Sequence, residues 1–334
     1  MCKLSLRTAI FYSFITGLLL LSSASAQRSV SVGMLRLVSN APLFIGIERG
    51  YFADEGLAID EVYFSAAAPI ATALASTAID VGATGITGGL YNTIAGGLGA
   101  RIVFDKGRVS EGFETSGLFV SNALADEVSS LEDLRGRTVG VTQIGSTFHY
   151  MLGELLLLEG MELSDVSVVP LNSLQALQEA LRSGRIDSAI LPQPVAGNLL
   201  AEEGAQLLLW ADDFLDYQVA AVFYSAGFML DSAAAQAFAR AYVRSVREYH
   251  DACIASSRDS EACQEIIAII ADYTQAAPDV VRDGLYFMER DGALGLESIA
   301  AQLDWYYDQG FVARLQVDDV VDTNWQQEAA QRLP

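Results

Sequence analysis

Lysine, histidine and cysteine are scarce in this chain of 334 residues, and acidic residues outnumber basic ones by 42 to 20. The formal net charge is −22 at pH 7. A surface this acidic repels nucleic acid and anionic lipid, so neither is expected as a partner. Only two lysines, Lys3 and Lys106, and two histidines, His149 and His250, are present.

The N-terminus has the pattern of a signal peptide. Lys3 and Arg7 precede an apolar run over residues 9–21, and Ala24-Ser25-Ala26 matches the A-x-A cleavage pattern. The run is too short to cross a hydrocarbon core of about 30 Å, and no later segment has the pattern of a membrane span. We therefore expect residues 1–26 to be removed and the protein to be periplasmic. Because Gln27, and not a cysteine, stands directly after the cleavage site, no lipid anchor is predicted.

Removal of the leader would leave a single lysine and two cysteines. The mature charge would be 18 minus 42, or −24, and Lys106 would be the only lysine. Cys253 and Cys263 flank a polar break between two helical stretches, and an even cysteine count in an exported protein favours a disulfide between them. Two buried free thiols are the alternative. With only His250 nearby they fall short of a zinc site, and we predict no metal and no cofactor.

Internal repetition indicates the fold class. Strand-like runs alternate with helical periods over residues 29–210, which predicts an α/β fold with mainly parallel strands. The segments 73–80 (ALASTAID) and 180–187 (ALRSGRID) share the pattern A-L-x-S-x-x-I-D, and each begins 41 positions after a strand that ends in Val-Gly. Two similar halves, with ligand-binding loops at the carboxyl ends of their strands, predict two lobes that face each other across a cleft.

The segment GSTFH, residues 145–149, holds one of the two histidines. Gly145 ends a strand and loop, and Ser146 and Thr147 are suited to begin the following helix. The free N–H groups and the dipole of a helix start favour an anion, so Gly145, Ser146, Thr147, Phe148 and His149 are candidate ligand-binding residues. Two alternatives remain. Ser146 only caps while His149 packs against the lobe, or the two form a nucleophile and its base, although neither a third orienting acid nor a GxSxG turn is present.

Further candidates lie in other loops. Lys106 follows a strand and would supply the counter-charge for an acidic ligand, unless it is only a solvated turn base beside Asp105. The loop 82–89 (GATGITGG) lacks the spacing of a dinucleotide fingerprint, and Thr84, Gly85 and Thr87 fit hydrogen bonding and close approach to a ligand.

Four more candidates complete the predicted site. Asn40 begins the first helix and either contacts the ligand or caps, Gln193 offers a neutral donor and acceptor, and Phe64 and Tyr217 are aromatic side chains near loops. An apolar loop at 66–69 and Phe148 suggest that the ligand has a nonpolar part.

Four segments together resemble a known family. APLFIGIERGYFADEGLAIDEV (41–62), ALASTAIDVG (73–82), SLEDLRGRTVGVTQIGSTFHYML (130–152) and ALRSGRIDSAILPQP (180–194) are similar to the soluble substrate-binding proteins of ABC importers. The branch is the one for aliphatic sulfonates, nitrate, taurine and thiamine-pyrimidine precursors. The resemblance covers about residues 30–225 and is not specific to one ligand.

The resemblance implies a two-lobed periplasmic-binding-protein fold of type II. Lobe one would comprise 28–116 and 222–334, lobe two 117–221, with crossovers at 116–121 and 220–225. It implies a monomer, not an enzyme, that delivers a small organic anion (sulfonate- or carboxylate-like) or a related polar or aromatic solute to a permease in the inner membrane. A sensor subunit for a membrane receptor is the alternative. A third possibility is an enzyme like the pyrimidine synthases of thiamine biosynthesis. Such enzymes carry a cysteine-rich iron motif, and this sequence has none.

Overall fold

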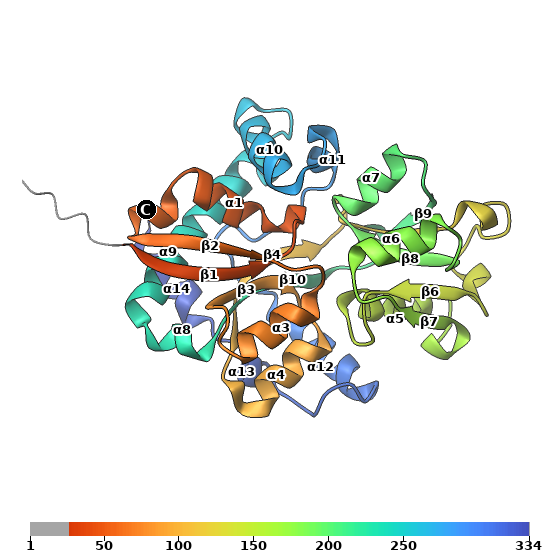
Figure 1. The fold of residues 1–334 in the computed structure, drawn as a ribbon, viewed down its shortest axis with the longest axis horizontal. Helices are drawn as coiled ribbons and strands as arrows, with labels where there is room; N and C mark the ends of the chain where they lie inside the picture. The colour runs from red at the N-terminus through yellow and green to blue at the C-terminus, as the bar shows by residue number, and fades with distance from the viewer. Residues whose placement is uncertain (1–26, 334) are drawn as a thin grey trace, which may run out of the picture.

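The computed structural model describes residues 27–333, which form two lobes, each built on a five-stranded sheet (Figure 1). The strand order is β2-β1-β3-β10-β4 in the first sheet and β7-β6-β8-β5-β9 in the second. The α/β class with two lobes is confirmed. Each sheet is mixed, because β10 in one and β5 in the other run antiparallel to both neighbours. The expected signal peptide, residues 1–26, lies outside the described residues.

The strands of the first sheet are β1 (Arg28–Met34), β2 (Leu57–Tyr63), β3 (Val81–Gly85), β4 (Arg101–Val109) and β10 (Tyr217–Tyr224). Those of the second are β5 (Ser116–Val120), β6 (Thr138–Val141), β7 (Ser167–Pro170), β8 (Ser188–Pro192) and β9 (Gln206–Trp210).

The helices are α1 (Ala41–Glu48), α2 (Tyr51–Asp54), α3 (Ala67–Ala75), α4 (Gly88–Thr93), α5 (Thr147–Leu158), α6 (Leu174–Arg182), α7 (Val195–Ala201), α8 (Ala226–Leu230), α9 (Ser232–Tyr249), α10 (Glu261–Thr274), α11 (Pro278–Asp283), α12 (Leu296–Asp308), α13 (Val317–Val320) and α14 (Asn324–Arg332). No helix within residues 27–333 has the length and apolar character needed to cross a membrane.

The repeated Ile-Asp motif ties the central strands of each half together. Asp80 accepts the backbone N–H of Ser31 at 3.1 Å, and the Ser31 hydroxyl accepts the N–H of Asp80 at 3.0 Å. In the second lobe Asp187 accepts the N–H of Thr138 at 2.7 Å, and the Thr138 hydroxyl accepts the N–H of Asp187 at 2.9 Å. The two halves therefore use the same reciprocal pair, and this explains why Asp recurs at this place in the repeat.

The repeated Val-Gly motif has an equally direct structural reason. A side chain added at Gly33 would place its Cβ 2.5 Å from Ile79, and one added at Gly140 would place it 2.5 Å from Ile186. These isoleucines precede Asp80 and Asp187 in the motif. Each glycine is thus needed where a strand passes beneath the buried isoleucine of its own half.

The chain passes between the lobes at β5 and again before β10. The outgoing crossing was placed at residue 116, where β5 begins in the second sheet. The return crossover was placed at 220–225, with lobe one resuming at residue 222, but β10 pairs with β4 of the first sheet from Tyr217 and with β3 from Ala220. The structure thus puts the start of the return strand five positions earlier, at Tyr217, because β10 is one continuous strand of the first sheet.

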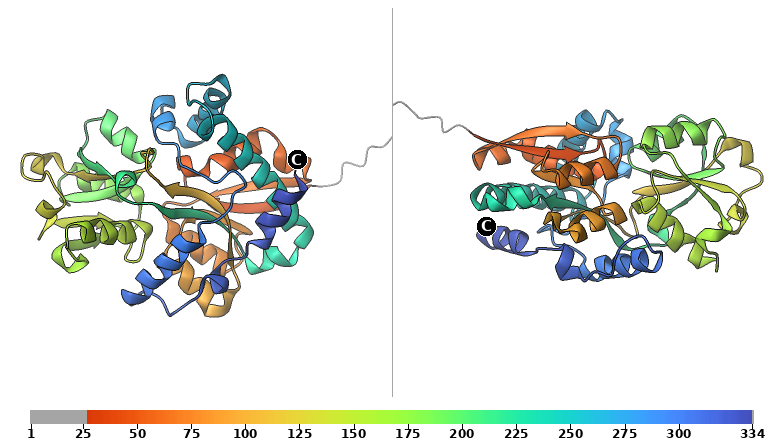
Figure 2. Two further views of the ribbon diagram at one scale, coloured as in Figure 1. Left: turned by 180° about the vertical axis from the view of Figure 1, so that it is seen from behind. Right: turned by 60° about the horizontal axis from the view of Figure 1, so that its bottom comes forward.

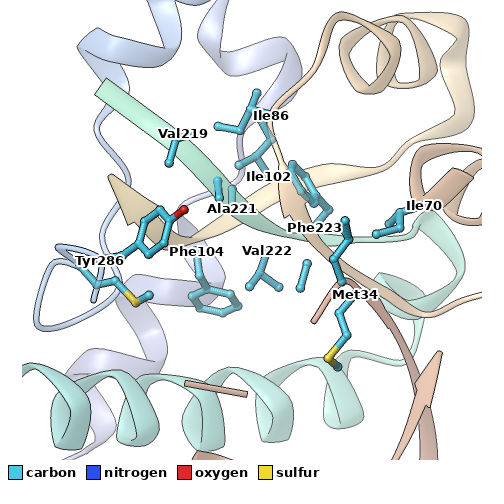
Figure 3. Packing of buried hydrophobic residues seen from close by; sticks show 14 of the residues in the cluster. Met34, Ile70, Ile86, Ile102, Phe104, Val219, Ala221, Val222, Phe223 and Tyr286 are labelled. Atoms are coloured by element: carbon cyan, nitrogen blue, oxygen red, sulfur yellow. The ribbon is translucent and has the colours of Figure 1, made fainter. Parts of the chain in front are cut away.

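The C-terminal helices lie on the first lobe. Helix α9 packs on α1, α2 and α14, and α10 packs on α1. The C-terminus lies at the end of this lobe that points away from the second (Figures 1 and 2). Between these helices and β10 lies the core, which includes Phe104 of β4 (Figure 3). Phe104 contacts the rings of Tyr224 and Tyr242.

Cys253 and Cys263 form a disulfide, which confirms the pairing expected from their spacing. It joins the segment after α9 to the first turn of α10, and neither cysteine lies at the interlobe cavity described below.

Replacing Cys253 and Cys263 together with serine is expected to lower the free energy of unfolding by about 2–3 kcal/mol, because the disulfide closes a short loop in the unfolded chain. Ligand affinity should be unchanged. Chemical denaturation measures the first and calorimetric titration the second. Two free thiols in the denatured, unreduced exported protein would contradict the prediction.

Candidate functional site

A cavity of about 50 Å³ lies between the lobes, at the ends of strands from both sheets. Such loops at strand ends are where open α/β sheets bind ligands. The first lobe contributes Leu35, Leu37, Ser39, Ala66, Ala67, Thr84, Gly85, Lys106, Val219, Ala220 and Tyr286, and the second contributes Ser116, Thr142, Thr147, Phe148, Leu174 and Pro192.

Lys106 supplies the only charged side chain in this lining. It lies on β4 with 1% of its surface exposed, and its Nζ donates to Ser39 Oγ at 2.7 Å. Within residues 27–333 its ammonium forms no ion pair. Burial lowers the pKa of Lys106 to about 7, against an opposing contribution from Asp105. The alternative that Lys106 is a solvated turn base is therefore wrong.

Asp105 belongs to the scaffold behind Lys106. Its carboxylate accepts the N–H of Gly107 at 2.7 Å, the side-chain amide of Gln218 at 2.6 Å and the N–H of Glu289 at 2.8 Å. Burial raises the pKa of Asp105 to about 6, and these hydrogen bonds oppose the rise. The carboxylate is thus committed to the scaffold and does not line the cavity.

Five serine and threonine hydroxyl groups accompany the ammonium. Ser39 and Thr84 come from the first lobe, and Ser116, Thr142 and Thr147 come from the second. The side-chain oxygen of Ser116 is buried without a hydrogen-bonding partner among the described residues. Hydroxyls and an ammonium donate to an anion, and no Asp or Glu is present in the described lining to repel one. The arrangement therefore fits an anion held from both lobes.

The rest of the wall is apolar. Leu35, Leu37, Phe148 and Leu174 line it, and Val219 lies at the start of the core formed along β10 (Figure 3). A low-dielectric wall strengthens the attraction between the ammonium and an anion.

The residues of the GSTFH turn have two different roles, lining the cavity and ordering the start of α5. Thr147 and Phe148 line the cavity, whereas Ser146 caps α5, its Oγ accepting the N–H of His149 at 3.3 Å. The Nδ1 of His149 accepts the N–H of Gly145 at 3.0 Å, and burial lowers the pKa of His149 to about 4. His149 is thus a neutral side chain that orders the turn, not a base directed at Ser146.

The same turn carries contacts between the lobes. Gly145 has a φ of 75°, a conformation that favours glycine, and its carbonyl accepts the N–H of Gly88 at 2.9 Å. A Cβ at Gly85 would lie 2.9 Å from the Thr147 side chain of the opposite lobe. The absence of a side chain at residue 85 therefore lets the two walls of the cavity approach each other.

Asn40 and Thr87 lie beside the cavity without lining it. The side-chain amide of Asn40 donates to the carbonyl of Leu35, and its Oδ1 has no partner among the described residues. Thr87 caps α4 by accepting the N–H of Leu90 at 3.1 Å. Both residues shape loops that present their neighbours, Ser39 and Gly85, to the cavity.

Gln193 and Tyr217 are also outside the lining. The Gln193 side chain donates to the carbonyl of Glu114 at 3.0 Å and accepts the N–H of Gly197 at 3.1 Å. Tyr217 is buried against the ring of Tyr150, with ring centroids 5.0 Å apart. Both side chains therefore contact other segments of the protein and do not face the cavity.

Phe64 lines a second, more open groove next to the cavity. We call it the outer groove, and its other lining residues are Leu35, Arg36, Leu37, Tyr63, Ser65, Leu174, Gln175, Gln178 and Val195. The groove and the cavity share Leu35, Leu37 and Leu174. Phe64 thus lies toward the outside of the cleft, beyond these leucines.

Of the residues predicted from the sequence, the structure brings together Thr84, Gly85, Lys106, Thr147 and Phe148. Sequence reasoning missed the polar lining residues Ser39, Ser116, Thr142 and Tyr286. The loop containing Ser39 and the crossover containing Ser116 were both recognised, but which side chain faces inward was not. Tyr286 carries no local signal, because it follows α11, far from the repeats in sequence.

Ser146 and Thr147 offer a matched pair of substitutions. Thr147→Val is expected to weaken anion binding about threefold to tenfold, because it removes one hydroxyl donor from the cavity while keeping the side-chain shape. Ser146→Ala should instead lower the free energy of unfolding by about 1 kcal/mol through loss of the helix cap, with little change in affinity. Calorimetry and chemical denaturation of both variants separate the two roles. Equal losses of affinity would contradict this division.

Comparison with known proteins assigns the chain to a family. Residues 23–271 match the model of the NMT1-like family. The chain belongs to this family. A search of curated proteins finds no match.

Solved structures share the architecture of this NMT1-like protein. A ligand-binding component of an ABC-type import system from Staphylococcus aureus, with zinc bound, has a TM-score of 0.75 at 18% identity, covering 91% of this chain and 99% of the other. The nitrate-binding protein NrtA from Synechocystis PCC 6803 has a TM-score of 0.74 at 16% identity, covering 92% of this chain and 89% of NrtA. The alkanesulfonate-binding protein SsuA from Xanthomonas axonopodis pv. citri, bound to MOPS, has a TM-score of 0.71 at 19% identity, covering 90% of this chain and 100% of SsuA.

At these identities the likeness establishes the fold, and the periplasmic-binding-protein fold expected from the sequence is confirmed. Within residues 27–333, no three His, Cys, Asp or Glu side chains are grouped so that they could hold a metal ion.

Proposed function

We propose that this protein is the solute-binding component of an ABC importer and that it captures a small organic anion, sulfonate- or carboxylate-like. The observation that carries the proposal is the ammonium of Lys106, enclosed between the lobes with hydroxyls from both. An isolated charge in an apolar cavity is costly, and an anion there would offset that cost. The fold shared with importer components supports the transport role.

The acidic character of the chain as a whole contrasts with the single cation, Lys106, in the cavity. With a net charge of −22, the surface as a whole repels anions. A cation enclosed in the cleft is screened little by solvent, so it acts at short range on a solute that has already entered. Selectivity for an anion would therefore be local to the cavity.

The size of the cavity limits what fits in the closed arrangement. One water needs about 10–15 Å³ of such space, so 50 Å³ holds a solute of about three or four water-sized groups. Nitrate, methanesulfonate and short carboxylates are of this size. A longer substituent would pass Leu37 and Leu174 into the outer groove.

No catalytic step is proposed. In the turn that contains Ser146 and His149, the serine oxygen accepts a backbone N–H, and the histidine Nδ1 accepts another. A nucleophile paired with a base would instead place the serine hydroxyl on an imidazole nitrogen. Both side chains are engaged in ordering the start of α5.

The proposed partner is the importer's permease in the inner membrane, and the proposed location is the periplasm, where the protein would act as a monomer. A sensor subunit that docks on a membrane receptor would use the same binding site. The neighbouring genes distinguish the two, since an importer requires a permease and an ATPase whereas a sensor requires a receptor kinase.

Thermal-shift screening of the purified protein tests the proposed function. The panel comprises nitrate, methanesulfonate, longer alkanesulfonates, short and aromatic carboxylates, and a neutral pyrimidine. A solute at 100 times its dissociation constant should stabilise the fold by about 2.7 kcal/mol, raising the melting temperature. Stabilisation by the pyrimidine alone would contradict the anion assignment, and no stabilisation by any member would contradict the solute class.

A further inference from the structure

The environment of Lys106 has a thermodynamic consequence for ligand binding. Its Nζ is buried, and its one hydrogen bond within residues 27–333 is to a neutral hydroxyl, that of Ser39 at 2.7 Å. A hydroxyl accepts from an ammonium and equally donates to a neutral amine, so this contact accommodates both protonation states. In the unliganded protein, then, no partner holds the proton on Lys106 strongly.

The charged and titratable groups around the cavity do not replace that missing partner. Asp105 is held by Gly107, Gln218 and Glu289 on the far side of β4. Asp212, near the crossover, accepts the N–H groups of Thr115 and Ser116 at 2.9 and 3.2 Å.

The side chains of His149 and Tyr286 remain neutral at ordinary pH. His149 on α5 accepts the N–H of Gly145, and its pKa is lowered to about 4 by burial. Tyr286 donates to the carbonyl of Thr115 at 3.0 Å, and burial raises its pKa. Burial raises the pKa of both Asp105 and Asp212 to about 6. Above pH 7, Lys106 is therefore the group at the cavity that changes charge.

We propose that binding of an anion in this cavity is coupled to uptake of one proton by Lys106. The inference rests on the proposed function, because it requires an anion at this site. The proton comes from bulk water and adds to the Nζ lone pair, and no other bond changes. The anion supplies the counter-charge that the unliganded cavity lacks, so it stabilises the ammonium form. By linkage, the protonated lysine must in turn bind the anion more tightly than the neutral lysine.

The sign of the pH dependence follows from the direction of the coupling. Burial sets the pKa of Lys106 in the free protein at about 7, and a bound anion raises it. Affinity should fall as the pH rises above this value, by about fivefold between pH 7 and pH 8. Proton uptake on binding should be about half a proton at pH 7 and about nine-tenths at pH 8.

The scarcity of lysine makes a direct test practical. Protein grown with lysine labelled at Cε with carbon-13 has at most two side-chain signals, from Lys3 and Lys106. The signal that disappears in Lys106→Arg belongs to Lys106. We expect it to titrate near pH 7 in an anion-poor buffer and to move to higher pH when methanesulfonate or nitrate is added. A signal that titrates only above pH 10 without added anion would overturn the inference, and so would one that neither anion shifts.

Calorimetry separates this inference from the proposed function. For the solute that stabilises the protein in the screen, titrations at pH 8 in buffers of different ionisation enthalpy measure the protons taken up. Lys106→Arg, which keeps a charge at every pH tested, should bind with the same affinity at pH 7 and pH 8. Tight anion binding with no proton uptake would overturn the coupling and leave the proposed function standing. Binding of a neutral solute alone would overturn the coupling and the anion assignment, while the transport role would stand.

Discussion

Replacing Lys106 with methionine is expected to weaken anion binding about 100-fold at pH 6, which corresponds to about 2.7 kcal/mol. The methionine keeps most of the side-chain volume but removes the only charge that lines the cavity. The free energy of unfolding should not fall, because the substitution removes a buried ammonium that has no ion pair within residues 27–333. Calorimetric titration and chemical denaturation measure the two effects.

Arg36→Met is the matched control for this prediction. Arg36 is the basic residue of the outer groove, where it donates to the carbonyl of Tyr273 at 2.7 Å and lies over the ring of Tyr63. Because its charge is exposed and lies outside the cavity, its loss should change affinity by less than about threefold. If the two variants lost affinity equally, the anion would lie in the groove and the assignment of the cavity would be wrong.

The largest expected loss of stability is that of Phe104→Ala, about 3–5 kcal/mol. Phe104 is fully buried on β4, two positions before Lys106 (Figure 3). It contacts the rings of Tyr224 and Tyr242. Truncation would leave a cavity between β10 and α9, where helix and sheet are too tightly packed to close it. Urea denaturation should show a lower midpoint with an unchanged slope.

The control for Phe104→Ala is an apolar side chain that is not buried. Leu230 at the end of α8 is 88% exposed, so Leu230→Ala should change the free energy of unfolding by less than about 0.5 kcal/mol. A loss for Phe104→Ala no larger than that of Leu230→Ala would contradict the packing between β4, β10 and α9.

Local regularities of the sequence were sufficient for the architecture of the two halves. The reciprocal pairs of Asp80 with Ser31 and of Asp187 with Thr138 join parallel neighbours within one half, so the same spacing recurs in both. The disulfide was predictable for a similar reason, because Cys253 and Cys263 are close in sequence and flank one turn. The disulfide spans 10 positions, and each reciprocal pair spans 49 positions within one repeated half, so neither contact requires the other half of the chain.

The return strand could not be placed from local pattern. Strand β10 lies between β3 and β4, antiparallel to both, and its first residues are as buried as its last. An apolar run of this kind fits either lobe, and only pairing with partners more than a hundred positions away decides between them. The sequence therefore put the boundary inside the strand, at residue 222.

Which side chains meet at the cavity was decided by the tertiary structure. The sequence by itself indicated most of the loops that line the cleft, though not the segment of Tyr286, and that Lys106 is the one lysine among them. Within those loops a shift of one position exchanges a cavity-facing side chain for a buried one, as with Ser39 and Asn40. Tyr286 reaches the cavity from a distant segment only because that segment packs against the crossover, where its hydroxyl meets Thr115. The burial and charge state of Lys106 likewise depend on residues from both lobes. No single stretch of the chain contains all of these residues.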